Sequence, residues 1–164
     1  MLKHKGAAIV LQEVPDEISL AINITGCTHR CAGCHSPYLW EDDGEPVMSS
    51  LYYLIKPYLD YMTCVCLMGG DQDQNELTML FKIIHADGFK TCLYTGYDNM
   101  SDLIKPLLDE LDYIKIGRYI QEKGPLTSPT TNQRMYRKDS SGTWVDITGR
   151  FWTKYAEKEE GNPA

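Results

Sequence analysis

Short apolar segments alternate with longer amphipathic segments along the chain, and this alternation limits the fold more than any other feature. The expected strands are residues 8–14, 17–24, 63–68, 89–94 and 113–116, and the expected helices are residues 49–61, residues 74–87 and a third one capped by Asn99 or Ser101. Strands that alternate with helices form a mainly parallel sheet with right-handed crossovers. A complete eight-unit barrel takes about 250 residues. The 164 residues therefore predict an α/β fold built as a partial, open (βα) barrel.

The composition is that of one folded domain. Apolar residues make up 43% of the sequence, which is enough for a buried core. We expect a single domain over residues 1–157 and a loose tail over residues 158–164, where the sequence is charged and ends in Gly-Asn-Pro-Ala. The formal net charge of −7 argues against a nucleic-acid partner, because such partners bind basic surfaces.

The sequence contains no candidate membrane span or signal peptide. No apolar stretch approaches the ~20 residues that cross a bilayer, and the apolar run near the N-terminus is short and followed by Glu13. We therefore expect a cytoplasmic protein without a membrane partner, in which thiols stay reduced. The six cysteines are then expected to be ligands, nucleophiles or core residues rather than three disulfides.

Unusual residues follow four of the five expected strands. They are residues 27–34, 69–71, 95–97 and 117–118. Parallel α/β folds carry their sites at the carboxyl ends of the strands. Four separate segments of the sequence thus predict one shared site at one edge of the sheet.

Three cysteines with the spacing C-x3-C-x2-C dominate the first of these segments. They are Cys27, Cys31 and Cys34, and no fourth cysteine lies nearby. Three thiolates on one tight loop can each bind one iron of a four-iron cluster, which leaves the last iron open for a substrate. Gly26 and Gly33 allow the backbone to wrap closely around such a cluster.

Two other interpretations of this loop stay open. Cys31 and Cys34 alone have the spacing of a redox dithiol, and the three cysteines with His29 and His35 are possible zinc ligands. A redox dithiol normally opens a helix in a thioredoxin-type fold, whereas here an extra cysteine precedes it on a loop. Structural zinc sites usually draw on two separated ligand pairs, and no second pair follows. The spacing therefore favours an iron–sulfur cluster.

The remaining cysteines fall within expected strands. Cys64 and Cys66 would share one face of their strand, and Cys92 lies in the next strand. No further ligands accompany them at a suitable spacing. We expect all three to be core residues.

The cysteine spacing after a core strand resembles the radical S-adenosylmethionine (SAM) superfamily. The string GCTHRCAGCHSPYLW at 26–40 is similar to the activating enzymes of anaerobic ribonucleoside-triphosphate reductases. The resemblance extends to LYTGY at 93–97, DYIKIGRYI at 112–120 and SPTTNQRMYR at 128–137. It implies a short barrel of the radical SAM type that binds one 4Fe-4S cluster and SAM. It also implies a role as a glycyl radical activase, with the reductase and an electron donor such as flavodoxin or ferredoxin as partners.

The resemblance further implies which residues contact SAM. It assigns the methionyl amino group to Gly69, Gly70 and Asp71, the ribose or methionyl carboxylate to Thr95, the methionyl carboxylate to Lys115 or Arg118, and the adenine to Gly33, Cys34 and His35. Two positions depart from the family pattern: Gly33 replaces a common aromatic residue, and Asp71 replaces a glutamate. Because Asp71 is one methylene shorter, the carbonyls of Gly69 and Gly70 would carry more of the contact.

Plainer explanations of these positions remain. Gly69–Asp71 also fits a glycine turn with a helix-capping acid, Thr95 fits a strand end, and Lys115 fits a solvated edge residue. For the whole chain, the alternatives are a radical SAM enzyme that acts on a small molecule, such as a deazaguanine-forming synthase, and a zinc or redox module. The short length and the string at 128–137 favour the activase.

Overall fold

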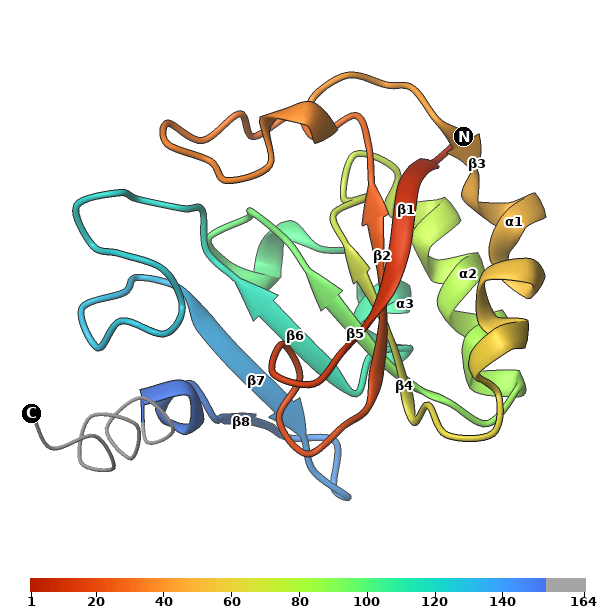
Figure 1. Ribbon diagram of the computed structural model, residues 1–164. Coiled ribbons are helices and arrows are strands. Elements are labelled where there is room, and N and C mark those ends of the chain that lie inside the picture. The colour runs from red at the N-terminus through yellow and green to blue at the C-terminus, as the bar shows by residue number, and fades with distance from the viewer. Residues whose placement is uncertain (153–164) are drawn as a thin grey trace, which may run out of the picture.

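The computed structural model describes residues 1–152, which form one eight-stranded mixed sheet with helices packed on one face (Figure 1). The strands are β1 Lys3–Val10, β2 Ser19–Ile24, β3 Glu45–Pro46, β4 Cys64–Met68, β5 Lys90–Tyr94, β6 Tyr113–Ile116, β7 Arg134–Lys138 and β8 Trp144–Asp146. The helices are α1 Val47–Ile55, α2 Gln74–Ala86 and α3 Lys105–Asp109, with short 3-10 helices at Pro37–Leu39, Lys56–Tyr58 and Met100–Asp102. The strand order is β3-β1-β2-β4-β5-β6-β7-β8.

The centre of the sheet is parallel and its flanks are antiparallel. Strands β2, β4, β5 and β6 pair in parallel, and α1, α2 and α3 lie in the connections between them, as the alternation predicts. β1 and β3 on one flank, and β7 and β8 on the other, pair antiparallel. Antiparallel neighbours need only short connections, which is why these strands fit beside the crossover units. The sheet is therefore mixed rather than mainly parallel, and it does not close; the partial-barrel interpretation stays a prediction.

Several element boundaries differ from the sequence expectation. β1 spans Lys3–Val10 instead of residues 8–14, because its polar first half pairs with β2 and β3 through the backbone, with a register shift near Gly6. Helix α1 starts at Val47, directly after Pro46, and not at a serine cap. It ends at Ile55, since Pro57 lacks the amide hydrogen that a continued helix requires.

The β7–β8 hairpin was not expected from the sequence. Its turn is held by the Asp139 carboxylate, which accepts hydrogen bonds from the backbone of Ser141 and Thr143, each at 2.9 Å. Gly142 completes the turn in a left-handed conformation, with φ of 83°. The Asp-Ser-Ser-Gly sequence was the available signal for this turn. The expected boundary at residue 157 and the tail over 158–164 lie outside the described residues.

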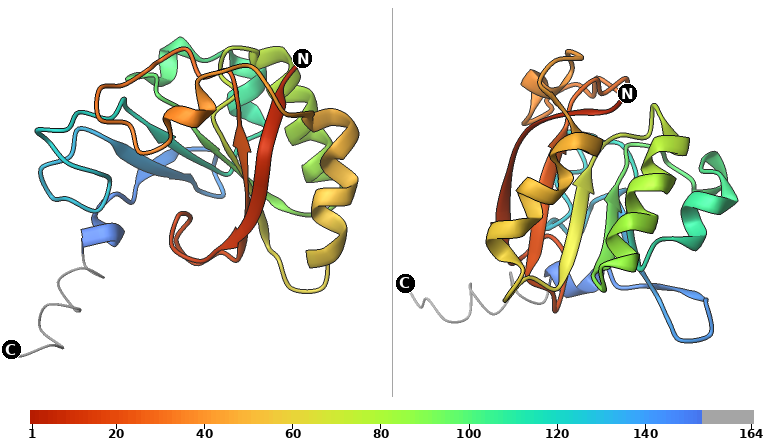
Figure 2. Two further views of the ribbon diagram at one scale, coloured as in Figure 1. Left: turned by 45° about the horizontal axis from the view of Figure 1, so that its top comes forward. Right: turned by 90° about the vertical axis from the view of Figure 1, so that its right-hand side faces the viewer.

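The two faces of the sheet bury different kinds of side chain. Toward the helices, Leu20, Ile22 and Ile24 of β2 pack with the apolar residues of α1 and α2 in the main core, as their alternation predicts. Figure 2 shows α1 and α2 side by side on this face. The opposite face forms a second core that contains Cys64, Cys66, Cys92, Tyr113, Met135 and apolar residues of the surrounding loops.

The four parallel strands end at the same edge of the molecule, where the loop after β2 also lies (Figure 1). The four unusual segments of the sequence follow these strands directly and are therefore gathered there. Within residues 1–152, no helix is long and apolar enough to cross a membrane.

Candidate functional site

Turns and single hydrogen bonds hold the cysteine loop, which connects β2 to the first 3-10 helix. The backbone N–H of Cys27 donates to the carbonyl of Leu39 at 3.1 Å, and that of Cys34 donates to the carbonyl of Cys31 at 3.1 Å. Gly33 lies within this second turn at φ 76°, a left-handed conformation that favours glycine. The local sequence thus bends the chain tightly between the second and third cysteines.

The three loop cysteines form a donor set that suits a four-iron cluster. All three are free thiols with partly exposed side chains. The backbone N–H of Ser36 donates to Sγ of Cys34 at 3.4 Å, a type of bond that tunes cluster thiolates. Within residues 1–152, no three Cys, His, Asp or Glu side chains are grouped tightly enough to hold one metal ion. A four-iron cluster makes no such demand, because each cysteine binds a different iron.

The two histidines of the zinc alternative face other partners. Nε2 of His29 lies 2.8 Å from Oδ2 of Asp71. The ring of His35 lies 5.3 Å from the ring of Tyr119, centroid to centroid. Each imidazole therefore has a partner outside the set of three cysteines.

Asp71 is the buried acid of the site. It follows β4 through Gly69 and Gly70, whose φ angles of 99° and 100° turn the chain sharply after the strand. Its side chain is 3% exposed, and its Oδ2 accepts hydrogen bonds from His29 and from the Thr95 hydroxyl. Asp73, not Asp71, caps helix α2 by accepting from the Glu76 backbone at 3.0 Å. The glycine turn therefore delivers Asp71 into the site instead of to the helix.

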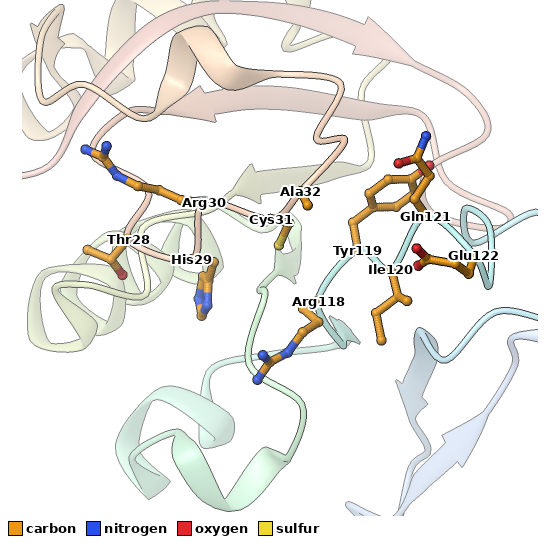
Figure 3. Close-up of a pocket in the computed structure, with 10 residues that line it drawn as sticks. All are labelled: Thr28, His29, Arg30, Cys31, Ala32, Arg118, Tyr119, Ile120, Gln121 and Glu122. Carbon is orange, nitrogen blue, oxygen red and sulfur yellow. The ribbon is translucent and has the colours of Figure 1, made fainter.

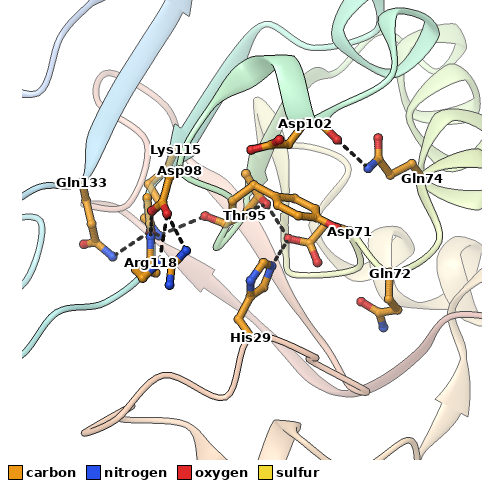
Figure 4. A network of polar contacts seen from close by, with 12 residues as sticks. His29, Asp71, Gln72, Gln74, Thr95, Asp98, Asp102, Lys115, Arg118 and Gln133 are labelled. Carbon is orange, nitrogen blue, oxygen red and sulfur yellow. Dashed lines mark hydrogen bonds and ion pairs between the residues drawn. The ribbon is translucent and has the colours of Figure 1, made fainter.

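Thr95 supports Asp71 from the end of β5. Its hydroxyl donates to Asp71 and accepts from the backbone N–H of Tyr97 at 3.1 Å, while its own backbone N–H donates to the carbonyl of Lys115 at 2.9 Å. Gly96 follows, and a Cβ at this position would lie 2.7 Å from the His29 ring. The Thr-Gly-Tyr segment thus holds one carboxylate and leaves space for one imidazole (Figure 4).

Lys115 is buried at the end of β6, so it is not a solvated edge residue. Its Nζ donates to the carbonyl of Gly117 at 2.7 Å and to that of Thr95 at 3.2 Å. Burial lowers the pKa of Lys115 from 10.5 to about 8, against the opposing attraction of negative charge at Cys31 and Asp71. The ammonium is therefore held beside the cysteine loop and the acid.

Arg118, the alternative cation, is already paired. Its guanidinium lies 2.6 Å from Oδ2 of Asp98 at the exposed rim of the site. The hydrogen bonds from Arg118 hold the pKa of Asp98 below its usual range. Lys115 is thus the buried cation of the site, and Arg118 belongs to a surface ion pair.

A pocket of about 530 Å³ opens between the cysteine loop and the segment after β6 (Figure 3). Residues 28–32 line one side and residues 118–122 line the other. Just beside it, Gly33 leaves room for Gln121 and Tyr119, because a Cβ there would lie 3.1 Å from the Gln121 amide oxygen. The pocket lies next to two of the residues predicted to contact adenine, Gly33 and His35.

Sequence reasoning missed two residues of this site. The cysteine pattern indicates His29 only as a possible zinc ligand, although its place midway between Cys27 and Cys31 puts it on the loop that faces the strand ends. Tyr119 belongs to no predicted site; its signal is an aromatic side chain three residues after an expected strand. The structure gathers the predicted residues at one edge, and which of them bind a cofactor stays a prediction.

The other three cysteines lie away from this loop. Cys64, Cys66 and Cys92 have no exposed surface and pack in the second core, as expected for core residues. Burial raises the pKa of the Cys64 and Cys92 thiols above the usual range.

Comparison with known proteins identifies the family. Residues 18–137, well over half of the chain, match the 4Fe-4S single cluster domain family. Searches of curated proteins and of solved structures found no match. The matched segment includes the loop cysteines and every strand end that contributes to the site. The chain therefore belongs to the 4Fe-4S single cluster domain family and is an iron–sulfur protein.

Proposed function

We propose that the chain is a radical SAM activase that generates a glycyl radical on an anaerobic ribonucleoside-triphosphate reductase. One observation carries the proposal: the loop with three free thiols contacts the strand-end acid Asp71 through His29 and lines a pocket of about 530 Å³. The sequence resemblance to such activases supplies the reaction and the partner. The family match to iron–sulfur proteins supports the cluster.

The bound groups would supply the reaction's electrons and radical. With SAM at the open iron, the reduced cluster would supply the electron for cleavage of SAM, and the products would be methionine and, after transfer of a hydrogen atom from the glycine α-carbon, 5′-deoxyadenosine and a glycyl radical. Cys27, Cys31 and Cys34 would hold three of the four irons. The protein's own task is to hold SAM in place and to exclude water.

Different polar residues would bind the amino group and the carboxylate of the methionyl part of SAM. Oδ2 of Asp71 is engaged by His29 and Thr95, and Oδ1 makes no hydrogen bond within residues 1–152, so it is free to accept from the amino group. The Lys115 ammonium donates to two carbonyls and has one N–H left for the carboxylate. The Thr95 hydroxyl would support Asp71, and its second lone pair would still be able to accept a hydrogen bond from SAM.

The adenine would lie against the second half of the loop. Gly33, Cys34 and His35 offer backbone groups there, and the Tyr119 ring stands beside them. Aromatic rings stack on bases at modest free-energy gain, about 1–3 kcal/mol per base. Tyr119 would thus supply an aromatic surface where Gly33 has none.

The partners follow from the same chemistry. The glycine that loses hydrogen belongs to the reductase, and a carrier such as flavodoxin or ferredoxin would deliver the electron. Six free cysteines within the described residues fit a reducing compartment, so we place the protein in the cytoplasm.

The test is anaerobic activation of the reductase. The chain is reconstituted with iron and sulfide, reduced, and mixed with SAM and the reductase. We expect a glycyl radical signal by electron paramagnetic resonance (EPR) and release of 5′-deoxyadenosine, both absent with Cys31→Ala. Release of 5′-deoxyadenosine with a small metabolite and no protein radical would instead identify a small-molecule radical enzyme. A colourless preparation that contains zinc and no iron would overturn the proposal.

A further inference from the structure

We propose that His29 is a positioning residue that couples the cysteine loop to the cofactor-binding carboxylate of Asp71. When the loop is ordered around its cluster, His29 holds Asp71 in the geometry that binds the methionyl amino group. The inference rests on the proposed function, since it concerns the same SAM site. It assigns a role in SAM affinity to a residue that is neither an iron ligand nor a SAM contact.

The first observation is a direct link between two segments far apart in sequence. His29 lies two residues from both Cys27 and Cys31, and its Nε2 lies 2.8 Å from Oδ2 of Asp71. A carboxylate can only accept hydrogen bonds, so Nε2–H of His29 is the donor. The two side chains are 18% and 3% exposed, so little water competes for the bond. Figure 4 shows the imidazole directed from the loop toward the acid.

The second observation is that the rest of the site fixes the imidazole ring. Tyr97 meets the ring edge to face, with centroids 4.9 Å apart. Gly96 leaves the space that the ring occupies, because a Cβ there would lie 2.7 Å from both Cγ and Cδ2 of His29. The backbone of Gly96 does not need the left-handed region. The space needed by the His29 ring, and not the backbone conformation of the turn, therefore explains the glycine at position 96.

The third observation concerns the acid itself. His29 and Thr95 both donate to Oδ2, and no described residue within 1–152 donates to Oδ1. Two donors on one oxygen fix the plane of the carboxylate and leave the other oxygen for a ligand. Thr95 donates from the end of β5, whereas His29 donates from the cysteine loop. Only the His29 bond can therefore depend on the state of the loop.

These observations predict a coupling between cluster and SAM beyond the bond to the open iron. Supporting residues that orient a ligand typically change affinity 10- to 100-fold when removed. Loss of the His29 bond leaves Asp71 with one donor and more rotational freedom. SAM should then bind more weakly although all three cysteines still hold the cluster.

The experiment measures the dissociation constant of SAM for the reconstituted protein by equilibrium dialysis. His29→Leu removes the donor, whereas His29→Gln retains an N–H at a similar distance from the backbone. We expect His29→Leu to weaken SAM binding on the order of tenfold with unchanged iron and sulfide content. His29→Gln should recover most of the affinity. The matched control is His85→Gln, which alters the other histidine–carboxylate contact, at 2.9 Å from Asp112, and should leave SAM affinity unchanged.

Gly96→Ala tests the ring position without changing a residue of the loop, and His29→Ala provides the background for its control. Gly96→Ala should weaken SAM binding in the wild-type background, because its methyl group displaces the imidazole. In the His29→Ala background the same substitution should have no further effect, since the ring is gone. If His29→Leu loses iron, the SAM affinity of Gly96→Ala in the wild-type background decides the matter.

The outcomes separate the inference from the function on which it rests. Wild-type affinity in both His29→Leu and Gly96→Ala, with SAM bound normally by the wild type, would overturn the role of His29 alone. An equal loss from Gly96→Ala with and without His29 would also overturn it. If the reconstituted wild type does not bind SAM, the proposed function is wrong, and the proposed coupling of the cysteine loop to Asp71 is wrong as well. The EPR spectrum of the reduced cluster gives an independent readout, because His29→Leu should need a higher SAM concentration to change it.

Discussion

The chain carries two sets of three cysteines, and their surroundings differ in almost every respect. The loop set, Cys27, Cys31 and Cys34, lies on irregular backbone with partly exposed thiols. The core set, Cys64, Cys66 and Cys92, lies on two paired strands with no exposed surface. Residue type is the same in both sets, so backbone geometry and solvent access determine whether the thiols can bind iron.

Access and geometry explain the difference. A loop can curve its thiols around an inorganic core, whereas cysteines on flat strands point into tightly packed space. Burial raises the pKa of Cys64 and Cys92, which keeps them protonated and poor as ligands. The core set behaves as small apolar side chains, and the loop set is available for iron.

The largest expected effect is complete loss of the cluster, and only substitutions in the loop set should cause it. Cys31→Ala would remove one of the three proposed cluster ligands, so anaerobic reconstitution should give a protein without bound iron. Cys92→Ala should retain the full iron and sulfide content, because its thiol is buried in the second core. Iron and sulfide analysis of both variants checks this. Loss of iron from Cys92→Ala would remove the distinction between the two sets.

Thiol reactivity separates the two sets in the cluster-free protein. The three thiols of the loop set should react readily with an alkylating reagent. The three thiols of the core set should react slower by a factor on the order of 10³ or more, because the core must open before the reagent reaches them. Mass spectrometry of the labelled peptides reads each site. In the cluster-bound protein the rapid labelling of the loop thiols should disappear. Rapid labelling of Cys64 or Cys66 in the folded chain would contradict the burial described here.

Lys115, the buried cation of the site, gives a pH-dependent test. Its pKa of about 8 in the folded chain is below the ordinary 10.5, so between these values the unfolded chain binds more protons and stability rises with pH. Relative to Lys115→Met, the cluster-free wild type should gain on the order of 2–3 kcal/mol of unfolding free energy across this window. Denaturant unfolding of both proteins from pH 7 to pH 10.5 measures it. A constant difference would show that the ammonium is not buried.

The smallest expected effect is a loss of unfolding free energy when a cysteine of the core set is replaced. Cys92→Ala leaves a small cavity in the second core and should lower the unfolding free energy by about 1–2 kcal/mol. Cys34→Ala in the cluster-free protein should cost less, because its side chain is partly exposed. Equal costs for the two substitutions would mean that the loop thiols are packed as tightly as the core.

The sequence predicted the parts of the fold that depend on local pattern. The alternation of apolar strands and helices placed β2, β4, β5 and β6 and the edge where they end. It did not place β7 and β8: β7 pairs with the edge of β6, and β8 pairs with β7. The first strand was shifted for the same reason: backbone pairing, which leaves little trace in hydropathy, selected residues 3–10.

For the site, sequence reasoning located residues but not all of their contacts. The strand-end segments contain Asp71 and Thr95, the resemblance to the radical SAM superfamily added Lys115, and the structure brings all three to one edge. The bond from Thr95 to Asp71 and the link from His29 to Asp71 arise from tertiary packing of segments 24 and 42 positions apart. No local pattern encodes such a contact.

The most direct test of this account is the state of the cluster with and without SAM. Anaerobically reconstituted wild type should hold about four irons and four sulfides per chain, consistent with one 4Fe-4S cluster. Its reduced cluster should show an EPR spectrum that changes on addition of SAM, because one iron has no cysteine ligand. A reduced four-iron cluster whose spectrum is identical with and without SAM, or a protein that binds no iron, would contradict the account.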